Sequence, residues 1–338
     1  MHVHAFAAQH PKSPLTPFEY EPGPLHEDDV EIRVSHCGIC HSDIHLVDND
    51  WGMSTYPLVP GHEVVGTIVK KGSAVTTLQE GQRVGLGWQA GSCGGCEFCR
   101  HAEENLCANQ AATCVGRHGG FANSVRADSR FSIPIPEGLE SENAAPLLCG
   151  GITVYTPLRA YDVRPPMALG VIGVGGLGHL AVQYASAWGC EVTAFSTSDN
   201  KREEAMALGA DRFVNTSEAG SLARLTGHFD FLLSTVPADL DWGAYLGALR
   251  PKGKLCVVGV PQSEIHFQGF PLIAGQKSVC GSPIGSPAMI AEMLAFSARH
   301  GIAAKTERFP LERVNDALDR VRANGARYRV VLDVAGVA

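Results

Sequence analysis

The segment CGICHSDIH, residues 37–45, places two thiols, two imidazoles, a hydroxyl and a carboxylate close together. These donors suit a transition metal and a short path for a proton. A catalytic zinc takes three protein ligands and keeps one position open. Cys40 can supply one ligand, and His62 in PGHEVVG and Cys149 in PLLCGGITVY can supply the others. Each has a simpler interpretation alone, because an apolar-flanked cysteine is usually a core residue and a lone histidine a satisfied polar group.

A second group of thiols lies in SCGGCEFCRHAEENLC, where the spacing is C-x2-C-x2-C-x7-C. Short spacings let turns direct successive thiolates at one ion, and four thiolates suit a closed, tetrahedral structural zinc site. Two disulfides, unused thiols or an iron–sulfur cluster are the alternatives. The chain has 11 cysteines but shows no export signal, so we expect reduced thiols and favour zinc. The four residues are Cys93, Cys96, Cys99 and Cys107.

Length and charge limit the kinds of partner. A chain of 338 residues is longer than one typical core supports, so we expect two domains. Asp and Glu outnumber Lys and Arg by 35 to 27, which disfavours broad binding to nucleic acid or anionic lipid. No stretch approaches the roughly 18 apolar residues of a membrane span. We therefore expect a cytoplasmic protein with a small-molecule substrate, no nucleic acid and no membrane partner.

The order of segments predicts the elements that position these residues. From Val30 to about Ile135 the chain is strand-like, with glycine and proline at the turns. Beyond Cys149, apolar strands such as ALGVIGVG, CEVTAFS, FDFLLSTV and KLCVVGV alternate with helical stretches, which favours a parallel sheet with crossover helices. From about Pro287, two helical segments precede the strand YRVVLDV, which we expect to return to the first domain.

A glycine-rich turn follows the first of these parallel strands, in GVIGVGGLGHLAV. The spacing is G-x-G-x-x-G, and a helical stretch comes next. Alone, this motif is often only a flexible loop. Between a strand and a helix, however, its glycines permit a tight turn and the approach of a pyrophosphate to the helix N-terminus. The sequence therefore predicts dinucleotide binding at Gly173, Gly175, Gly176 and Gly178.

Together, these motifs resemble the zinc-dependent medium-chain dehydrogenase/reductase family from about Val30 onward. The phrases YPLVPGHEVVG, CGGITVY, GCEVTAFS and GARYRVVL are most similar to its cinnamyl-alcohol-dehydrogenase branch, particularly to bacterial NADPH-dependent aldehyde reductases. The resemblance implies an α/β fold in which a β-rich GroES-like catalytic domain accompanies a Rossmann domain with a doubly wound parallel sheet. The expected bounds are 1–151 for the catalytic domain with two zinc sites, 152–290 for the Rossmann domain, and 291–338 for a C-terminal return.

The resemblance also implies a role for each polar residue near the catalytic zinc. Cys40, His62 and Cys149 match its ligands, and Glu63 matches an acid that can approach the metal. Asp43 matches the carboxylate that orients the ligating histidine. Ser42 and His45 match a proton relay. His41 matches a position beside the cofactor pyrophosphate. Such a relay suits the reaction, because an alkoxide needs a proton while bulk water is excluded.

The same resemblance implies NADP(H) as the cofactor. It places Ser196 where an acid would hold a ribose 2′-hydroxyl, and hydroxyls with an ammonium group fit a 2′-phosphate better. Asp199 complicates this assignment, and a hydroxyl-rich turn with a solvated lysine is the alternative. The implied cofactor contacts are His41, Thr153, Gly173, Gly175, Gly176, Leu177, Gly178, Ser196, Thr197, Ser198, Lys201, Ser282 and Ile284.

Trp51, Met53 and Trp88 fall where the branch lines its substrate pocket, which suits flat or short apolar aldehydes. Both tryptophans could instead pack in the core. We predict reversible reduction of aldehydes to primary alcohols by hydride transfer from NADPH. A polyol or sugar dehydrogenase of the same fold, and a noncatalytic NADPH-binding zinc protein, are the alternatives. Relatives commonly form homodimers through the Rossmann sheet edge, and we expect the same here.

Overall fold

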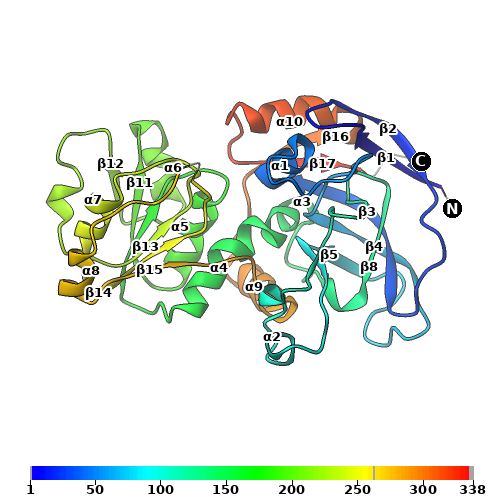
Figure 1. Ribbon diagram of the computed structural model, residues 1–338, viewed down its shortest axis with the longest axis horizontal. Helices are drawn as coiled ribbons and strands as arrows, with labels where there is room; N and C mark the ends of the chain where they lie inside the picture. Colours follow the sequence, from blue (N-terminus) through cyan, green and yellow to red (C-terminus); the bar gives the residue numbers. More distant parts are fainter. Residues whose placement is uncertain (1, 262, 335–338) are drawn as a thin grey trace. The chain divides into compact units, whose positions relative to one another are not determined.

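The computed structural model describes residues 2–261 and 263–334. The chain forms two compact units, Met1–Ile152 with Ile284–Ala338, and Thr153–Pro283 (Figure 1). Each combines a sheet with helices, so the predicted α/β class is confirmed. The functional division at 151/152 and 290/291 stays a prediction. In the described part of the chain, no helix has the length and apolar character that crossing a membrane requires.

The Thr153–Pro283 unit is built on a six-stranded sheet whose strand order is β12-β11-β10-β13-β14-β15. All neighbouring strands are parallel, and this arrangement is the doubly wound Rossmann order. All five residues of β10 are buried, as expected for a central parallel strand. The strands are β10 (Ala168–Ile172), β11 (Glu191–Ser196), β12 (Arg212–Asn215), β13 (Phe229–Ser234), β14 (Leu249–Val257) and β15 (Ser278–Gly281).

Crossover helices connect these strands. α5 follows β10 directly after the glycine-rich turn, and α6 follows β11, as the sequence predicts. The strands β12 and β15 were not predicted, because both are short and neither is a buried apolar run. The helices are α4 (Gly150–Ala160), which begins in the first unit, α5 (Gly178–Ala187), α6 (Arg202–Ala207), α7 (Trp242–Ala248) and α8 (Phe270–Gly275).

The other unit contains a seven-stranded sheet in which most neighbouring strands are antiparallel. β17 pairs with β3 through a register that matches Val330 with Ile39, so the red C-terminal strand lies beside a blue N-terminal one (Figure 1). The strands are β3 (Asp29–Ile39), β4 (Val64–Lys71), β5 (Arg83–Leu86), β8 (Ser124–Asp128), β9 (Ser132–Pro134), β16 (Thr306–Pro310) and β17 (Arg329–Asp333). The helices are α1 (His41–Asp48), α3 (Ser141–Ala144), α9 (Pro287–His300) and α10 (Val314–Arg322).

Two small hairpins complete this unit. β1 (Val3–Ala8) pairs antiparallel with β2 (Leu15–Tyr20), and both strands lie before Val30, where the predicted strands begin. Apolar residues at the alternate positions Val3, Ala5 and Ala7 were the available signal in the sequence, and all three are buried. The second hairpin, β6 (Gln89–Gly91) with β7 (Ala111–Ala112), brackets the four-cysteine loop. This loop contains only α2 (Glu97–Arg100) and a short 3₁₀ helix, η1 (Glu104–Leu106).

Candidate functional site

The segment CGICHSDIH forms the end of β3 and the start of α1. Cys40 is the N-cap residue of α1, and its backbone N–H donates to Oδ2 of Asp43 at 2.9 Å. The helix places Ser42 and His45 three residues apart, on neighbouring positions of its surface. The hydrogen bond between Cys40 and Asp43 therefore fixes the first turn of α1. This turn sets the positions of the Cys40 thiol and of the two predicted relay residues, Ser42 and His45.

The structure brings Cys40, His62, Glu63 and Cys149 together, with one donor atom of each within 4.8 Å of the others. The Sγ atoms of Cys40 and Cys149 are 4.0 Å apart. A tetrahedral zinc with Zn–S bonds of about 2.3 Å would separate two sulfurs by about 3.8 Å. Nε2 of His62 is buried and has no hydrogen-bond partner. Two thiols and a free imidazole nitrogen thus fit a zinc ion with three protein ligands.

Asp43 controls the orientation of His62. Its side chain is fully buried, and Oδ1 lies 2.9 Å from Nδ1 of His62. Because a carboxylate only accepts, Nδ1 carries the proton and Nε2 keeps its lone pair for a metal. Oδ1 also accepts the N–H of Gly61 at 2.9 Å. Asp43 therefore joins the two segments that carry Cys40 and His62.

Hydrogen bonding also prepares the thiol of Cys40 as a ligand. The hydrogen bond from Cys149 and the neighbouring His62 hold the pKa of Cys40 well below its usual range, although burial acts in the opposite direction. Metals bind the thiolate rather than the thiol. The low pKa therefore favours the form of Cys40 that a zinc ion requires.

Glu63 forms an ion pair with Arg329, a residue to which the sequence suggested no role. Its Oε1 accepts from Nη2 of Arg329, and both side chains are buried. Arg329 also donates to the carbonyl of Ile39 at 3.1 Å. Burial raises the pKa of Glu63 to about 7, although the guanidinium lowers it. Gly38 permits this approach, because a Cβ there would lie 2.0 Å from Oε2 of Glu63.

One of the two predicted relay residues, His45, has an acidic partner in Asp50. Oγ of Ser42 lies 3.6 Å from Sγ of Cys40, at the edge of the donor cluster. Nδ1 of His45 lies 2.7 Å from Oδ2 of Asp50, just beyond the end of α1. Sequence reasoning missed Asp50, because an acid in the loop after a predicted helix resembles any other exposed charge. Both side chains of the His45–Asp50 pair are partly exposed, so the pair is accessible to solvent.

Aromatic side chains lie beside the donor cluster, the group formed by Cys40, His62, Glu63 and Cys149. The rings of Trp88 and His62 meet edge to face with centroids 5.0 Å apart, and Trp51 meets Trp88 at 6.1 Å. Trp51 is 42% exposed and Met53 is 43% exposed, so neither side chain is buried in the core. Trp88 packs partly against it. The rings of Trp88 and Trp51 thus lie in sequence from His62 outward, and contacts of Trp51, Met53 and Trp88 with a substrate remain predictions.

The four-cysteine loop has the geometry of a second metal site. The sulfurs of Cys93, Cys96, Cys99 and Cys107 all lie within 4.8 Å of one another. Three of the separations are 3.5, 3.6 and 3.9 Å, close to the edge of a zinc–sulfur tetrahedron and far from the roughly 2.05 Å of a disulfide bond. All four cysteines are free. Backbone N–H groups of Gly95 and Cys96 lower the pKa of Cys93 to about 6, which favours a thiolate.

The glycine-rich turn leaves room for a phosphate group. Gly173 has φ of +90°, a conformation that other residues rarely adopt, and a Cβ at Gly178 would lie 1.8 Å from the carbonyl of Gly173. An added Cβ at Gly175 would meet no atom within 4 Å, so the turn is open at this position. Nζ of Lys201 donates to the carbonyl of Val174 at 2.7 Å. The turn thus fits a dinucleotide cofactor.

The end of β11 presents hydroxyl groups rather than a free carboxylate. Ser196 and Ser198 are half-buried and Thr197 is exposed. The carboxylate of Asp199 accepts from Nη2 of Arg202 at 2.5 Å and from Nδ2 of Asn215 at 2.9 Å. Its charge is therefore neutralised by local partners, which reduces the conflict with a 2′-phosphate. Lys201 remains a predicted phosphate contact, although its ammonium group also reaches the glycine-rich turn.

The remaining predicted cofactor residues lie at the ends of elements. His41 begins α1 and is exposed, and Thr153 is half-buried on α4. Leu177 precedes α5, and Ser282 and Ile284 follow β15, all three half-buried. Their contacts with a cofactor remain predictions.

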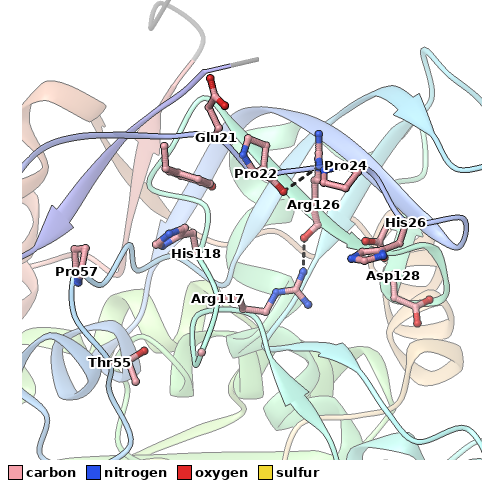
Figure 2. A pocket seen from close by; sticks show the side chains of 13 residues that line it. Glu21, Pro22, Pro24, His26, Thr55, Pro57, Arg117, His118, Arg126 and Asp128 are labelled. Atoms are coloured by element: carbon pink, nitrogen blue, oxygen red, sulfur yellow. Dashed lines mark hydrogen bonds between the residues drawn. The ribbon is translucent and has the colours of Figure 1, made fainter.

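A groove of about 740 Å³ in the first unit contains none of the predicted site residues (Figure 2). Its cations already have partners. Arg126 is paired with Glu31 and donates to the carbonyls of Pro22 and Gly23. Arg117 donates to the carbonyl of Arg126 (Figure 2). These arginines hold the β2 end of the hairpin in place, so we assign the groove no ligand.

Comparisons with known proteins agree with this fold and these donor sets. The family model described as Alcohol dehydrogenase GroES-like domain matches residues 26–137, and the model described as Zinc-binding dehydrogenase matches residues 176–299. The chain belongs to the family of zinc-binding, medium-chain alcohol dehydrogenases, and it is an oxidoreductase.

Individual relatives give this assignment more detail. The chain is 46% identical to Aldehyde reductase AdhA from Synechocystis sp. over 98% of both chains. It is 43% identical to Mannitol dehydrogenase from Petroselinum crispum, with 95% of this chain and 98% of the relative covered. A solved structure of CAD from Helicobacter pylori, complexed with NADP(H), superposes with a TM-score of 0.92 at 31% identity and covers 99% of both chains.

Proposed function

We propose that this protein is an NADPH-dependent aldehyde reductase that interconverts aldehydes and primary alcohols. The observation that carries the proposal is the buried, unpartnered Nε2 of His62 beside the thiols of Cys40 and Cys149. These three donor atoms are close enough to bind one zinc ion, and the aromatic ring of Trp88 lies next to His62. The 46% identical aldehyde reductase supports the choice of substrate.

In this proposal Cys40, His62 and Cys149 hold the catalytic zinc, and Cys93, Cys96, Cys99 and Cys107 hold the structural one. When bound, zinc polarises a carbonyl as a Lewis acid, and NADPH supplies the hydride. Ser42 donates a proton to the product oxygen and recovers it from His45. Asp50 holds Nδ1 of His45, which leaves the other ring nitrogen to exchange the proton with Ser42 in this proposal.

The direct test uses initial rates with benzaldehyde, cinnamaldehyde and butyraldehyde, each with NADPH and NADH, before and after zinc chelation. We expect turnover that prefers NADPH and is abolished by chelation. A zinc-replete protein that binds NADPH but reduces no aldehyde would overturn the proposal.

A polyol substrate is the second candidate, because the 43% identical relative is a mannitol dehydrogenase. The exposed indole of Trp51 beside Trp88 favours an apolar substrate over a polyhydroxylated one. Oxidation rates with mannitol and with benzyl alcohol at equal concentrations separate the two. Faster oxidation of mannitol would favour the polyol function.

The Ser196→Asp variant is expected to reverse the cofactor preference. A carboxylate at the end of β11 would repel a 2′-phosphate and accept the ribose hydroxyls of NADH. We expect the ratio of kcat/KM for NADPH to that for NADH to fall about 100-fold, or about 2.7 kcal/mol. Ser73→Asp, at an exposed position of the other unit, adds the same charge as a control. An unchanged ratio in S196D would contradict the assignment of Ser196.

Replacing His45 with Gln is expected to slow turnover about 10- to 100-fold without loss of zinc. Positioned acid–base groups contribute about this much or more, and water can partly replace a half-exposed imidazole. Steady-state kinetics and metal analysis test the prediction, and added imidazole should restore part of the rate. His26→Gln, at an exposed position, is the control. Equal kcat values for H45Q and H26Q would exclude the relay.

We further propose that the protein is a cytoplasmic homodimer joined through β15, the edge strand of its sheet. Large apolar side chains are exposed nearby in the sequence, with Val260 71%, Phe270 74% and Ile273 77% accessible. Exposed apolar side chains that form a contiguous patch mark an interaction surface, and in this proposal Phe270 and Ile273 of α8 belong to such a patch. Ile273→Asp should therefore convert a dimer into a monomer, as measured by size exclusion with light scattering. Met206→Asp, on α6, is the control, and a dimer that persists in I273D would exclude this interface.

A further inference from the structure

A single buried amide connects the four-cysteine loop with a distant part of the chain. Asn105 lies in η1, two residues before Cys107, and is only 9% exposed. Its Nδ2 donates to the backbone carbonyl of Ile284 at 2.9 Å, across 179 residues of sequence. Ile284 is the residue at which the chain returns to the first unit. The amide of Asn105 therefore binds the end of the connection between the two units.

The N-terminal end of the same connecting segment is held by a hydrogen bond within the Thr153–Pro283 unit. The carbonyl of Gly281, the last residue of β15, accepts from the hydroxyl of Tyr161. Only Ser282 and Pro283 lie between the two anchored carbonyls. Beyond Ile284, the buried Ser286 caps α9 by accepting the N–H of Met289. Asn105 is thus one of two anchors on a very short connecting segment.

The position of Asn105 depends on the folding of the four-cysteine loop. The loop has little regular structure of its own, and Nε2 of Gln89 donates to the carbonyl of Glu104 at 2.7 Å. A loop of this kind gains its order mainly from the metal that its thiolates bind. Zinc held by Cys93, Cys96, Cys99 and Cys107 would therefore fix the position of the Asn105 amide.

We propose that Asn105 is a positioning residue that couples the four-cysteine metal loop to cofactor binding. The coupling rests on the proposed function, which uses NADPH, and on the prediction that Ser282 and Ile284 contact this cofactor. By holding the carbonyl of Ile284, Asn105 orders this segment before NADPH arrives and reduces the entropy lost on binding. Coupling between two sites is reciprocal, so bound NADPH stabilises the four-cysteine loop in return.

The Asn105→Ala variant tests both directions of the coupling in the zinc-loaded, full-length protein. Loss of the hydrogen bond from the buried Asn105 amide to the carbonyl of the half-buried Ile284 should raise the Kd for NADPH about five- to tenfold, measured by NADPH fluorescence. Saturating NADPH should slow alkylation of the four loop cysteines by iodoacetamide about fivefold in the unmodified protein, measured by mass spectrometry of each peptide. In N105A this protection should disappear.

Asn143→Ala is the matched control, because Nδ2 of Asn143 donates to the carbonyl of Ala304 at the same 2.9 Å, beyond α9 and away from the connecting segment. N143A should keep both the affinity and the protection. If N105A does not fold, the isosteric Asn105→Asp, which cannot donate, replaces it. Full affinity and full protection in either Asn105 variant would overturn the coupling alone. An unmodified protein that binds no NADPH would overturn the proposed function and the coupling with it.

Discussion

The Cys40→Ala variant is expected to hold one zinc ion per chain instead of two and to reduce aldehydes at least about 1,000-fold more slowly. In the proposed zinc site Cys40 supplies one of three ligands, and its backbone also starts α1. Without its thiolate, His62 and Cys149 would hold the metal poorly, and the enzyme would lose a Lewis acid that lowers the activation barrier by several kcal/mol. Zinc content by mass spectrometry and kcat/KM with benzaldehyde measure both effects.

Cys37→Ala is the matched control for this variant. Cys37 lies in β3 three residues earlier and its thiol is fully buried, but it is outside the donor cluster. C37A should retain two zinc ions and turnover within a few fold. Two zinc ions and full turnover in C40A would exclude Cys40 as a ligand.

The second large effect is expected in the four-cysteine loop, where Cys96→Ser should remove one zinc ion and lower the Tm by at least about 5 °C. Structural zinc contributes its binding free energy to folding, and a hydroxyl cannot replace a thiolate ligand. Calorimetry with metal analysis provides the measurement. Cys280→Ser, a half-buried thiol outside both donor clusters, is the control. A C96S protein with two zinc ions and an unchanged Tm would show that the loop is not a metal site.

Features contained in one short segment were predictable from the sequence. The glycine-rich turn needs only a strand before it and a helix after it, and the structure has β10 and α5 there. The four cysteines lie within one loop, so their spacing alone indicates a shared ion. The buried strands of the Rossmann sheet are apolar runs, and the structure confirms β10, β11, β13 and β14.

Contacts between distant segments were not predictable in this way. Cys40 and Cys149 are 109 residues apart, and no periodicity brings them together. Their residue types made them candidate ligands, but only the family resemblance assigned them to one site. The Glu63–Arg329 ion pair depends on the register of β17 against β3, which the sequence does not reveal. Asp50 was missed because an acid in a loop looks like any exposed charge. Its role becomes visible only through its distance from His45.

The pairing of β17 with β3 has a consequence for the order of events during synthesis. The unit Thr153–Pro283 is continuous in sequence, so it can fold once its last residue has left the ribosome. The other unit cannot complete its sheet until Arg329–Asp333 emerges, close to the end of translation. Arg329 reaches Glu63 only at that stage. The donor cluster therefore acquires its final charge balance only after nearly the whole chain has been made. A nascent chain that ends before Arg329 would contain every proposed metal ligand but would lack the cation that pairs with Glu63.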